Sequence, residues 1–240
     1  MFTPKKICAL IIISTALCSS AQALEAPFYA PSDDKYLSLS LYTGWLRYAN
    51  TYGKDIFPTD TNGAEINLGL KVTKAVFVEG GISYGLQSTN KHPAARYIPG
   101  TGTNHLWDTS GMTSENRIYR TSLGLKMAVY TIPQINLGFI LGGGLSYTTI
   151  NASWDFDGVK SCIFNKTGIT PYFKTGAEYK INNSTFIGVT YTYVHLASLG
   201  IITPREYQDN THYFVNNIEI TPMIKAQDLH AVALTYLVSF

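Results

Sequence analysis

The sequence is poor in charges and in cysteines, and both shortages exclude classes of protein. Charged residues make up 14% of the 240 positions, and the 18 basic residues nearly balance the 16 acidic ones, so no basic surplus indicates nucleic-acid binding. Cys162 is the only cysteine beyond Cys18, so the chain after the N-terminal segment has no intramolecular disulfide. No apolar run in this later part approaches the roughly 20 residues of a membrane-spanning helix.

The N-terminal segment has the pattern of an export signal. Lys5 and Lys6 give it a positive start, Ile7–Leu17 is mainly apolar, and Ala21–Ala23 has the small first and last residues of a cleavage site. We predict removal of residues 1–23, which leaves residues 24–240 as one domain. Without the two lysines, the mature chain has 16 residues of each sign. An exported chain with so few charges is either a soluble periplasmic β-protein or a membrane barrel.

Eight segments alternate apolar and polar residues with a period of two. This pattern predicts strands that have one apolar and one polar face. Most segments reach the length of about 9–11 residues that a tilted strand needs to cross a bilayer, whereas strands of soluble domains average about 5–6 residues. The predicted strands are Tyr36–Leu46, Ala64–Thr73, Val76–Leu86, Tyr119–Val129, Ile135–Tyr147, Pro171–Tyr179, Thr185–Tyr193 and His230–Phe240.

Short and long connections alternate between these segments. The short ones are Lys74–Ala75, Tyr130–Gln134 and Lys180–Ser184, and the long ones are Arg47–Gly63, Gln87–Ile118, Thr148–Thr170 and Val194–Leu229. Outer-membrane barrels have short periplasmic turns and longer extracellular loops, whereas a soluble sandwich has no reason to sort its connections in this way. We therefore predict an all-β fold, an eight-stranded antiparallel transmembrane β-barrel with four long extracellular loops and both termini on the periplasmic side.

Aromatic residues gather near the ends of the predicted strands, on the faces that carry the apolar residues. Membrane barrels place aromatic side chains in girdles at both membrane interfaces. The residues in these positions are Trp45, Tyr84, Tyr147, Tyr179, Tyr191 and Tyr193. Their placement favours the membrane barrel over the soluble alternative, because a lipid-facing wall needs aromatic side chains at headgroup level.

The C-terminal segment resembles the assembly signal of outer membrane β-barrel proteins. In that family the chain ends in an aromatic residue, and apolar or aromatic residues occupy alternate positions before it. The matching residues here are Val232, Leu234, Tyr236, Val238 and Phe240. The segment Thr190–Gly200 also resembles the seventh strand of opacity-type and OmpA-like barrels. The resemblance implies insertion by the barrel-assembly machinery, and a family whose members are adhesins, surface antigens, structural anchors or, in a few cases, lipid-modifying enzymes.

Charged residues also occur on the polar faces of the predicted strands. They are Glu65, Lys71, Glu79, Arg120, Lys126, Lys174 and Glu178, three acids and four bases. A barrel of eight strands is just wide enough for side chains to fill, and charges in so narrow a space are costly unless they are paired. We therefore predict an ion-pair network that closes the lumen, with a narrow pore as the alternative.

His195 and Ser198 are the sharpest catalytic candidates. Lipid A deacylases of the PagL type resemble this chain in size and use a histidine, a serine and an acid. Their histidine and serine are two residues apart, whereas Ser198 follows His195 by three, which puts the pair on opposite faces of a regular strand. Glu206 or Asp209 could supply the acid. We predict that the chain is not an enzyme, with a lipid A acyl-ester hydrolase as the alternative.

The predicted function is therefore that of an outer-membrane surface protein with an antigenic, adhesive or structural role. Its loops would offer an interaction surface for a host or cell-surface ligand. Its other predicted partners are the lipids and lipopolysaccharide of the outer membrane and, during biogenesis, the barrel-assembly machinery. No motif indicates a cofactor, and the histidines lack the spacing of metal ligands.

Overall fold

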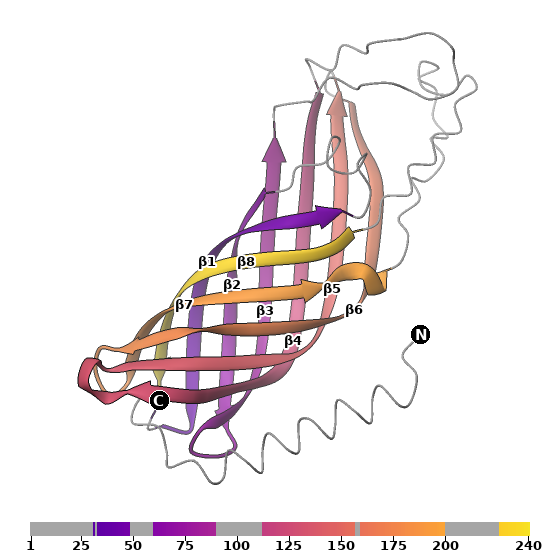
Figure 1. Cartoon of the computed structure of the whole chain (residues 1–240). Helices are drawn as coiled ribbons and strands as arrows, with labels where there is room; N and C mark the ends of the chain where they lie inside the picture. The colour runs from indigo at the N-terminus through magenta and orange to yellow at the C-terminus, as the bar shows by residue number, and fades with distance from the viewer. Residues whose placement is uncertain (1–30, 32, 49–59, 90–111, 157–158, 200–225) are drawn as a thin grey trace, which may run out of the picture.

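Eight antiparallel strands close into one barrel, with the last strand paired to the first (Figure 1). The structure is a computed structural model that describes residues 31, 33–48, 60–89, 112–156, 159–199 and 226–240. The strands are β1 (Lys35–Tyr48), β2 (Asp60–Lys71), β3 (Val76–Thr89), β4 (Met112–Ile132), β5 (Leu137–Phe156), β6 (Val159–Lys180), β7 (Thr185–His195) and β8 (Ala226–Ser239). In these residues no helix is long and apolar enough to span a membrane. The prediction of an eight-stranded antiparallel barrel is confirmed.

Three short connections meet at one end of the barrel, which we call the turn end; the opposite end is the loop end. Residues 72–75 join β2 to β3, the 3₁₀ turn η1 (Pro133–Ile135) joins β4 to β5, and residues 181–184 join β6 to β7. Asn136 follows η1 with a φ of 54°, a left-handed conformation that asparagine tolerates better than most residues. At the loop end, a second 3₁₀ turn, η2 (Leu196–Leu199), follows β7.

Side chains alternate between the lumen and the outer wall along each strand. On the outer wall, Leu41 and Leu234 are each 65% exposed. Ser40 and Ala233, their respective neighbours in sequence, are buried inside. An apolar outer wall is what a barrel needs when lipid surrounds it.

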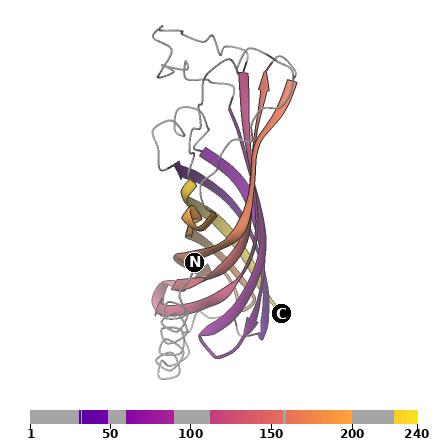
Figure 2. The same ribbon diagram turned by 90° about the vertical axis from the view of Figure 1, so that its right-hand side faces the viewer.

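Strands β4, β5 and β6 are longer than the others and rise beyond the rest of the barrel at the loop end (Figures 1 and 2). Strands β5 and β6 stay paired from Leu137↔Tyr179 up to Phe156↔Val159. Pairing of β6 with β7, by contrast, reaches only Tyr172↔Val194. The upper parts of β4, β5 and β6, residues 112–118, 148–156 and 159–171, therefore form a sheet that continues past the ring of eight strands. We call this region the projecting sheet.

The projecting sheet corrects the prediction of a long third loop. The segment Thr148–Thr170 is a paired hairpin apart from residues 157–158, and Cys162, predicted to lie in a loop, belongs to β6. The prediction was wrong because it looked for the apolar alternation of a lipid-facing strand. Beyond the bilayer that alternation is not required, since backbone hydrogen bonds to a neighbouring strand suffice for pairing.

The strand ends at the turn end also differ from the prediction. Strand β2 stops at Lys71 instead of Thr73, because the backbone N–H groups of Val72 and Thr73 turn back to donate to the carbonyl of Val76. Ile135 lies in η1 and not in β5. Pro133 opens that turn, where its missing N–H leaves no unpaired donor.

Glycines in the strand walls make room for large side chains inside the lumen. A Cβ at Gly69 would lie 2.0 Å from Cε1 of Tyr36, and one at Gly63 would lie 2.4 Å from Cζ of Tyr42. The two tyrosine rings therefore lie directly against the backbone of β2 at these glycines. This close approach lets aromatic rings fit in a barrel of only eight strands.

Candidate functional site

The lumen is closed by an apolar layer at the turn end. Six buried inward side chains, each at most 6% exposed, form one cluster there: Tyr36, Phe77, Ala128, Ile140, Phe186 and Leu237. The rings of Tyr36 and Phe77 meet edge to face, with centroids 5.3 Å apart. Sequence reasoning missed this layer, because it treated the inward faces as polar. The available signal was the alternation of faces along each strand. Phe77 lies two residues before Glu79, and Leu237 two before Ser239, so each apolar residue shares the inward face of its polar neighbour.

A bridge of charges crosses the lumen above this layer. The Nζ atom of Lys174 lies 2.6 Å from Oε1 of Glu79 and 3.2 Å from Oε1 of Glu65. Lys174 is on β6, whereas Glu65 is on β2, and these strands lie on opposite walls of the ring. The ammonium group of Lys174 therefore ties two distant walls together across the interior.

Further pairs extend the bridge into a network. Arg120 binds the second carboxylate oxygen of Glu65, and Nζ of Lys126 lies 2.7 Å from Oε1 of Glu178. The hydroxyl of Tyr36 donates to Oε2 of Glu79 over 2.6 Å, and its ring lies 4.6 Å below Nζ of Lys126. We call the six charged members the lumen network: Glu65, Glu79, Arg120, Lys126, Lys174 and Glu178.

The lumen network is enclosed and electrically balanced. Its members are between 2% and 7% exposed. Three carboxylates face three cations, and each charge has a partner of opposite sign. Buried charges are tolerated under these conditions, since removal of one partner strands the other in a medium of low dielectric.

The structure places Lys71, the seventh predicted member, apart from this network. Lys71 ends β2 at the turn end, and its Nζ atom lies 3.2 Å from the carbonyl oxygen of Pro31. Its side chain has the inward parity of Glu65, but the strand stops before the side chain can reach the centre. The alternation of faces therefore identified the face of β2 on which Lys71 lies, but not its position along the barrel.

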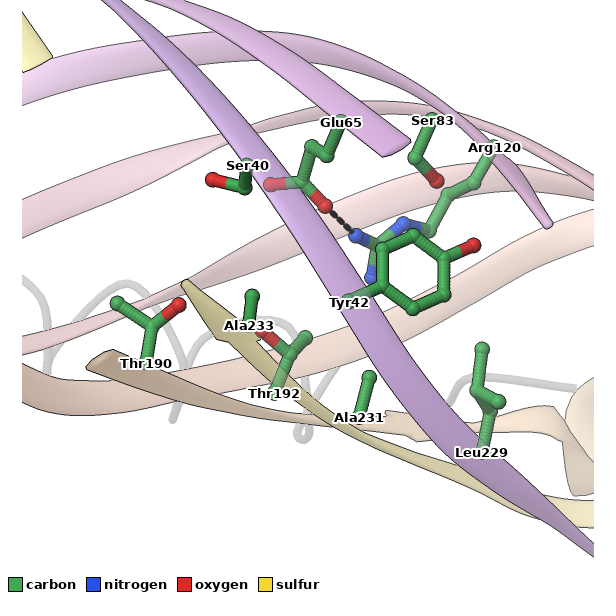
Figure 3. Close-up of a pocket in the computed structure, with 10 residues that line it drawn as sticks. All are labelled: Ser40, Tyr42, Glu65, Ser83, Arg120, Thr190, Thr192, Leu229, Ala231 and Ala233. Atoms are coloured by element: carbon green, nitrogen blue, oxygen red, sulfur yellow. Dashed lines mark hydrogen bonds and ion pairs between the residues drawn. The ribbon is translucent and has the colours of Figure 1, made fainter. Parts of the chain in front are cut away.

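A small cavity lies on the loop side of the Arg120–Glu65 pair (Figure 3). Its walls carry hydroxyl groups as well as small apolar side chains: Ser40, Tyr42, Ser83, Thr190, Thr192, Leu229, Ala231 and Ala233. Nε of Arg120 is buried there without a hydrogen-bond partner among the described residues. A polar cavity with an unpaired donor is the kind of place in which proteins hold ordered water.

Apolar side chains close the lumen again nearer the loop end. Six inward or capping residues there are at most 3% exposed: Leu46, Ile118, Ile150, Val194, Leu196 and Leu229. Leu229 is the cross-strand partner of both Leu46 and Val194, so one apolar row runs across β1, β8 and β7. The described lumen therefore has an apolar layer at each end and a charged, hydroxyl-rich middle.

The catalytic candidate His195 lies outside the lumen, on the outer wall at the loop end. Its Nδ1 atom is 3.3 Å from Oδ1 of Asp228, its cross-strand partner on β8. Ser198 belongs to η2, and its side chain is outside the described residues, as are Glu206 and Asp209. Sequence reasoning missed Asp228, because only the register of β7 against β8 brings it to His195. Within the described residues, no group of three or more His, Cys, Asp or Glu could hold a metal ion.

The residues that resemble an assembly signal share one face of the C-terminal segment, four of them in β8 and Phe240 directly after it. Val232, Leu234, Tyr236 and Phe240 are between 39% and 65% exposed on the outer wall, and Val238 is half-buried in the same row. The backbone N–H of Phe240 donates to the carbonyl of Lys35 over 3.0 Å. These residues therefore belong to the seam where β8 closes the ring against β1.

A protein-family model and several solved structures resemble this chain. The model of the outer membrane protein beta-barrel domain matches residues 9–221. Ail, the attachment invasion locus protein of Yersinia pestis, has a TM-score of 0.50 and 8% identity, over 87% of this chain and 99% of its own. A major outer membrane protein of Thermus thermophilus also has a TM-score of 0.50, with 9% identity over 86% and 99% of the two chains.

Neisserial surface protein A has a TM-score of 0.49 and 14% identity, over 86% of this chain and 97% of its own. No curated protein sequence matches this chain. At these identities, the structural likeness of Ail and the Thermus protein shows the fold alone.

Proposed function

The chain belongs to the family of the outer membrane protein beta-barrel domain, and on this basis we propose that it is a non-conducting surface protein of the outer membrane. Its barrel is the anchor, and its loop end faces the cell exterior and binds a host or cell-surface ligand. The single observation that carries the non-conducting role is the filled lumen. The Lys174 bridge between β2 and β6 occupies the centre, and apolar layers lie on both sides of it.

The projecting sheet supports the interaction role. Residues 148–156 of β5 and 159–171 of β6 continue as paired strands beyond the last β6–β7 pair, Tyr172↔Val194. Paired strands hold one another at a defined height above the ring, which an unpaired chain of the same length would not do. Ail, which shares the fold, is described as an attachment invasion locus protein, and this is a precedent for a small barrel with a surface role.

Conductance measurements test the closed lumen. Purified folded protein added to planar lipid bilayers should give no long-lived conductance steps, because the Lys174 bridge and the apolar layers fill the described part of the lumen. The matched control is the detergent solution without protein. Large channels of a single size from the wild-type protein would contradict the proposal and favour the narrow pore.

Shortening the projecting sheet tests the interaction role. Ala152 and Phe164 are cross-strand partners, so residues 153–163 can be replaced by an Asn-Gly turn, which suits a two-residue hairpin. The barrel should still fold and show heat-modifiable gel mobility, whereas attachment of expressing cells to host-cell layers should fall. Unchanged attachment with a folded barrel would exclude this sheet as the interaction surface.

Protease treatment of intact cells tests the orientation. Within the predicted connections Gln87–Ile118 and Val194–Leu229, cuts should fall between the observed elements, at residues 90–111 and 200–225, because exposed loop tips are preferred sites of cleavage. Cuts at Lys74 or Lys180, which lie in the short turns, would show that the barrel is inserted the other way round.

Ester hydrolysis is the second candidate function, and one observation favours it. The imidazole of His195 lies beside the Asp228 carboxylate on the outer wall, an arrangement in which a carboxylate orients a general base. Purified protein incubated with lipid A would release fatty acid if this function were correct, and His195→Ala would abolish the release. We propose the non-enzymatic role, so we expect no acyl chain to be released by either protein.

A further inference from the structure

Three strands bring a row of charged side chains together on the outer wall at the loop end. Arg47 on β1, Asp228 on β8 and His195 on β7 are cross-strand neighbours in one row. Nη2 of Arg47 lies 2.8 Å from Oδ2 of Asp228, and Nδ1 of His195 lies 3.3 Å from Oδ1. The carboxylate of Asp228 thus holds a basic side chain on each side.

The next row toward the turn end is aromatic. Trp45, His230 and Tyr193 are cross-strand neighbours on the same three strands. The rings of Trp45 and His230 are stacked at 5.2 Å with an interplanar angle of 6°, and Tyr193 meets His230 edge-on at 5.3 Å. The hydroxyl of Tyr193 donates to Oδ1 of Asp228 over 2.6 Å, which ties the two rows together. We call these six residues the outer-wall cluster.

The depth of the outer-wall cluster follows from the rows beneath it. Two rows further toward the turn end, the same three strands carry Leu41, Leu234 and Val189, which are 53–65% exposed. The outer wall therefore changes from aliphatic to aromatic to charged along the strands. This order is that of a bilayer boundary, with aromatic rings at the interface and charges at headgroup level.

The side chains of the charged row differ in their exposure, and the exposed ones are accessible to a ligand. The side chain of Asp228 is 6% exposed, whereas those of Arg47 and His195 are 56% and 46% exposed. The carboxylate is buried beneath its donors, and it offsets the charge of the guanidinium without covering it. A guanidinium has five N–H donors in a planar fork, so Arg47 has donors left for an acceptor that arrives from the side.

We propose that the outer-wall cluster binds the phosphorylated sugar headgroup of a glycolipid in the leaflet at the loop end. The fork of Arg47 fits a phosphate group, with His195 at the other side of Asp228 as a second donor. The ring of Trp45, which is 42% exposed and stacks on His230, offers a surface against which the C–H face of a sugar ring packs. This inference rests on the proposed placement in the outer membrane, but the binding itself does not depend on the orientation of the barrel in cells.

Native mass spectrometry of the folded full chain in detergent micelles tests this site. The probe is a bisphosphorylated diglucosamine lipid, compared with its dephosphorylated form, with phosphatidylglycerol and with inorganic phosphate. One copy of the phosphorylated glycolipid should bind, and loss of its phosphates should weaken binding about tenfold or more, as expected for a lost hydrogen bond between charged groups. Equal binding of phosphatidylglycerol or of inorganic phosphate would overturn the assignment to a glycolipid.

Substitutions locate the binding. Arg47→Gln and His195→Gln should each weaken binding of the phosphorylated glycolipid, Arg47→Gln by about tenfold, while heat-modifiable mobility confirms that each variant is folded. The matched control is Arg117→Gln on β4, since Arg117 is also an exposed arginine, 44% by side chain, that pairs with a carboxylate. Unchanged binding by a folded Arg47→Gln variant, or an equal loss in Arg117→Gln, would overturn the site. Failure of either kind leaves the conductance and protease tests of the proposed function unaffected.

Discussion

Glu79 in the lumen and Asp228 on the outer wall are held by nearly the same donors, but their cation partners differ in access to water. Each carboxylate accepts a hydrogen bond of 2.6 Å from a tyrosine, Tyr36 for Glu79 and Tyr193 for Asp228. Each also pairs with a cation, at 2.6 Å from Lys174 and 2.8 Å from Arg47. Both carboxylates are buried, but the side chain of Lys174 is 9% exposed and that of Arg47 is 56% exposed.

This difference separates a pair that stabilises the fold from a pair that is available to a ligand. In the lumen, water cannot replace a lost partner, so each charge depends on its neighbours. At the outer wall, solvent and headgroups can solvate the cation, and the pair therefore contributes little to stability. Exposure of the cation, and not burial of the carboxylate, decides which role the pair takes.

The largest expected effect comes from removing the lumen cation. Lys174→Met removes the cation that pairs with Glu79 and one of the two cations that pair with Glu65, and it should lower the free energy of unfolding by about 3–5 kcal/mol. Urea unfolding of the protein in lipid vesicles, followed by gel mobility without heating, measures this. Lys126→Met is the matched control and should have a smaller effect, because Lys126 pairs with one carboxylate, Glu178, among the described residues. A loss below about 1 kcal/mol for Lys174→Met would contradict the dependence on buried pairing.

The two tyrosines give the next comparison. Tyr36→Phe keeps the ring against Gly69 but removes the donor to Glu79, and should lower the free energy of unfolding by about 1.5–3 kcal/mol. Tyr193→Phe should have a smaller effect, since Asp228 keeps Arg47 and His195, whose side chains are about half exposed. The same unfolding measurement on both variants gives the ranking. If Tyr193→Phe were the more damaging of the two, the contrast between lumen and outer wall would fail.

Removing the outer-wall cation should have little effect on stability. Arg47→Gln should change the free energy of unfolding by about 0–1 kcal/mol, because the guanidinium is more than half exposed. The measurement is again urea unfolding in vesicles that contain no glycolipid, so that ligand binding does not contribute. A loss as large as that of Lys174→Met would show that the outer-wall pair is a structural element.

The smallest effect is the response to salt. The difference in stability between wild type and Arg47→Gln should shrink in about 1 M NaCl, where the Debye length falls to about 3 Å. The difference between wild type and Lys174→Met should stay nearly constant, because the lumen excludes the screening ions. Unfolding curves at low and high salt for the three proteins provide the test. If salt changed both stability differences equally, the contrast between the lumen and the outer wall would be contradicted.

The barrel could be predicted from the sequence because lipid on one side and a lumen on the other impose a strict alternation. Segments such as Ala64–Thr73 and Thr185–Tyr193 alternate throughout, and their ends lie within a few residues of the observed strand ends. The upper part of β5 and β6 could not be predicted in this way, since strands beyond the bilayer pair without an apolar face. The same reasoning identified Glu79 as inward but did not identify Phe77, which shares its face two residues earlier, because an inward apolar residue breaks the expected pattern.

The partners within each site could not be predicted from the sequence. The alternation of faces identifies Lys174 as inward. Its contact with Glu65, however, depends on how far β2 and β6, on opposite walls of the ring, are shifted relative to each other along the barrel. Likewise, the pairing of Asp228 with Arg47 and His195 depends on the registers of β8 against β1 and β7. Register is a property of the closed ring, and no single segment contains it.

The crossing bridge in the lumen also imposes an order on folding. Lys174 is 109 residues from Glu65 and 95 from Glu79 along the chain, so these contacts close long loops and form late. Until β6 joins the ring, the three side chains have no opposite wall and remain hydrated. The Lys174 bridge therefore requires β6 to stand opposite β2, and it joins two walls of the ring that share no backbone hydrogen bonds.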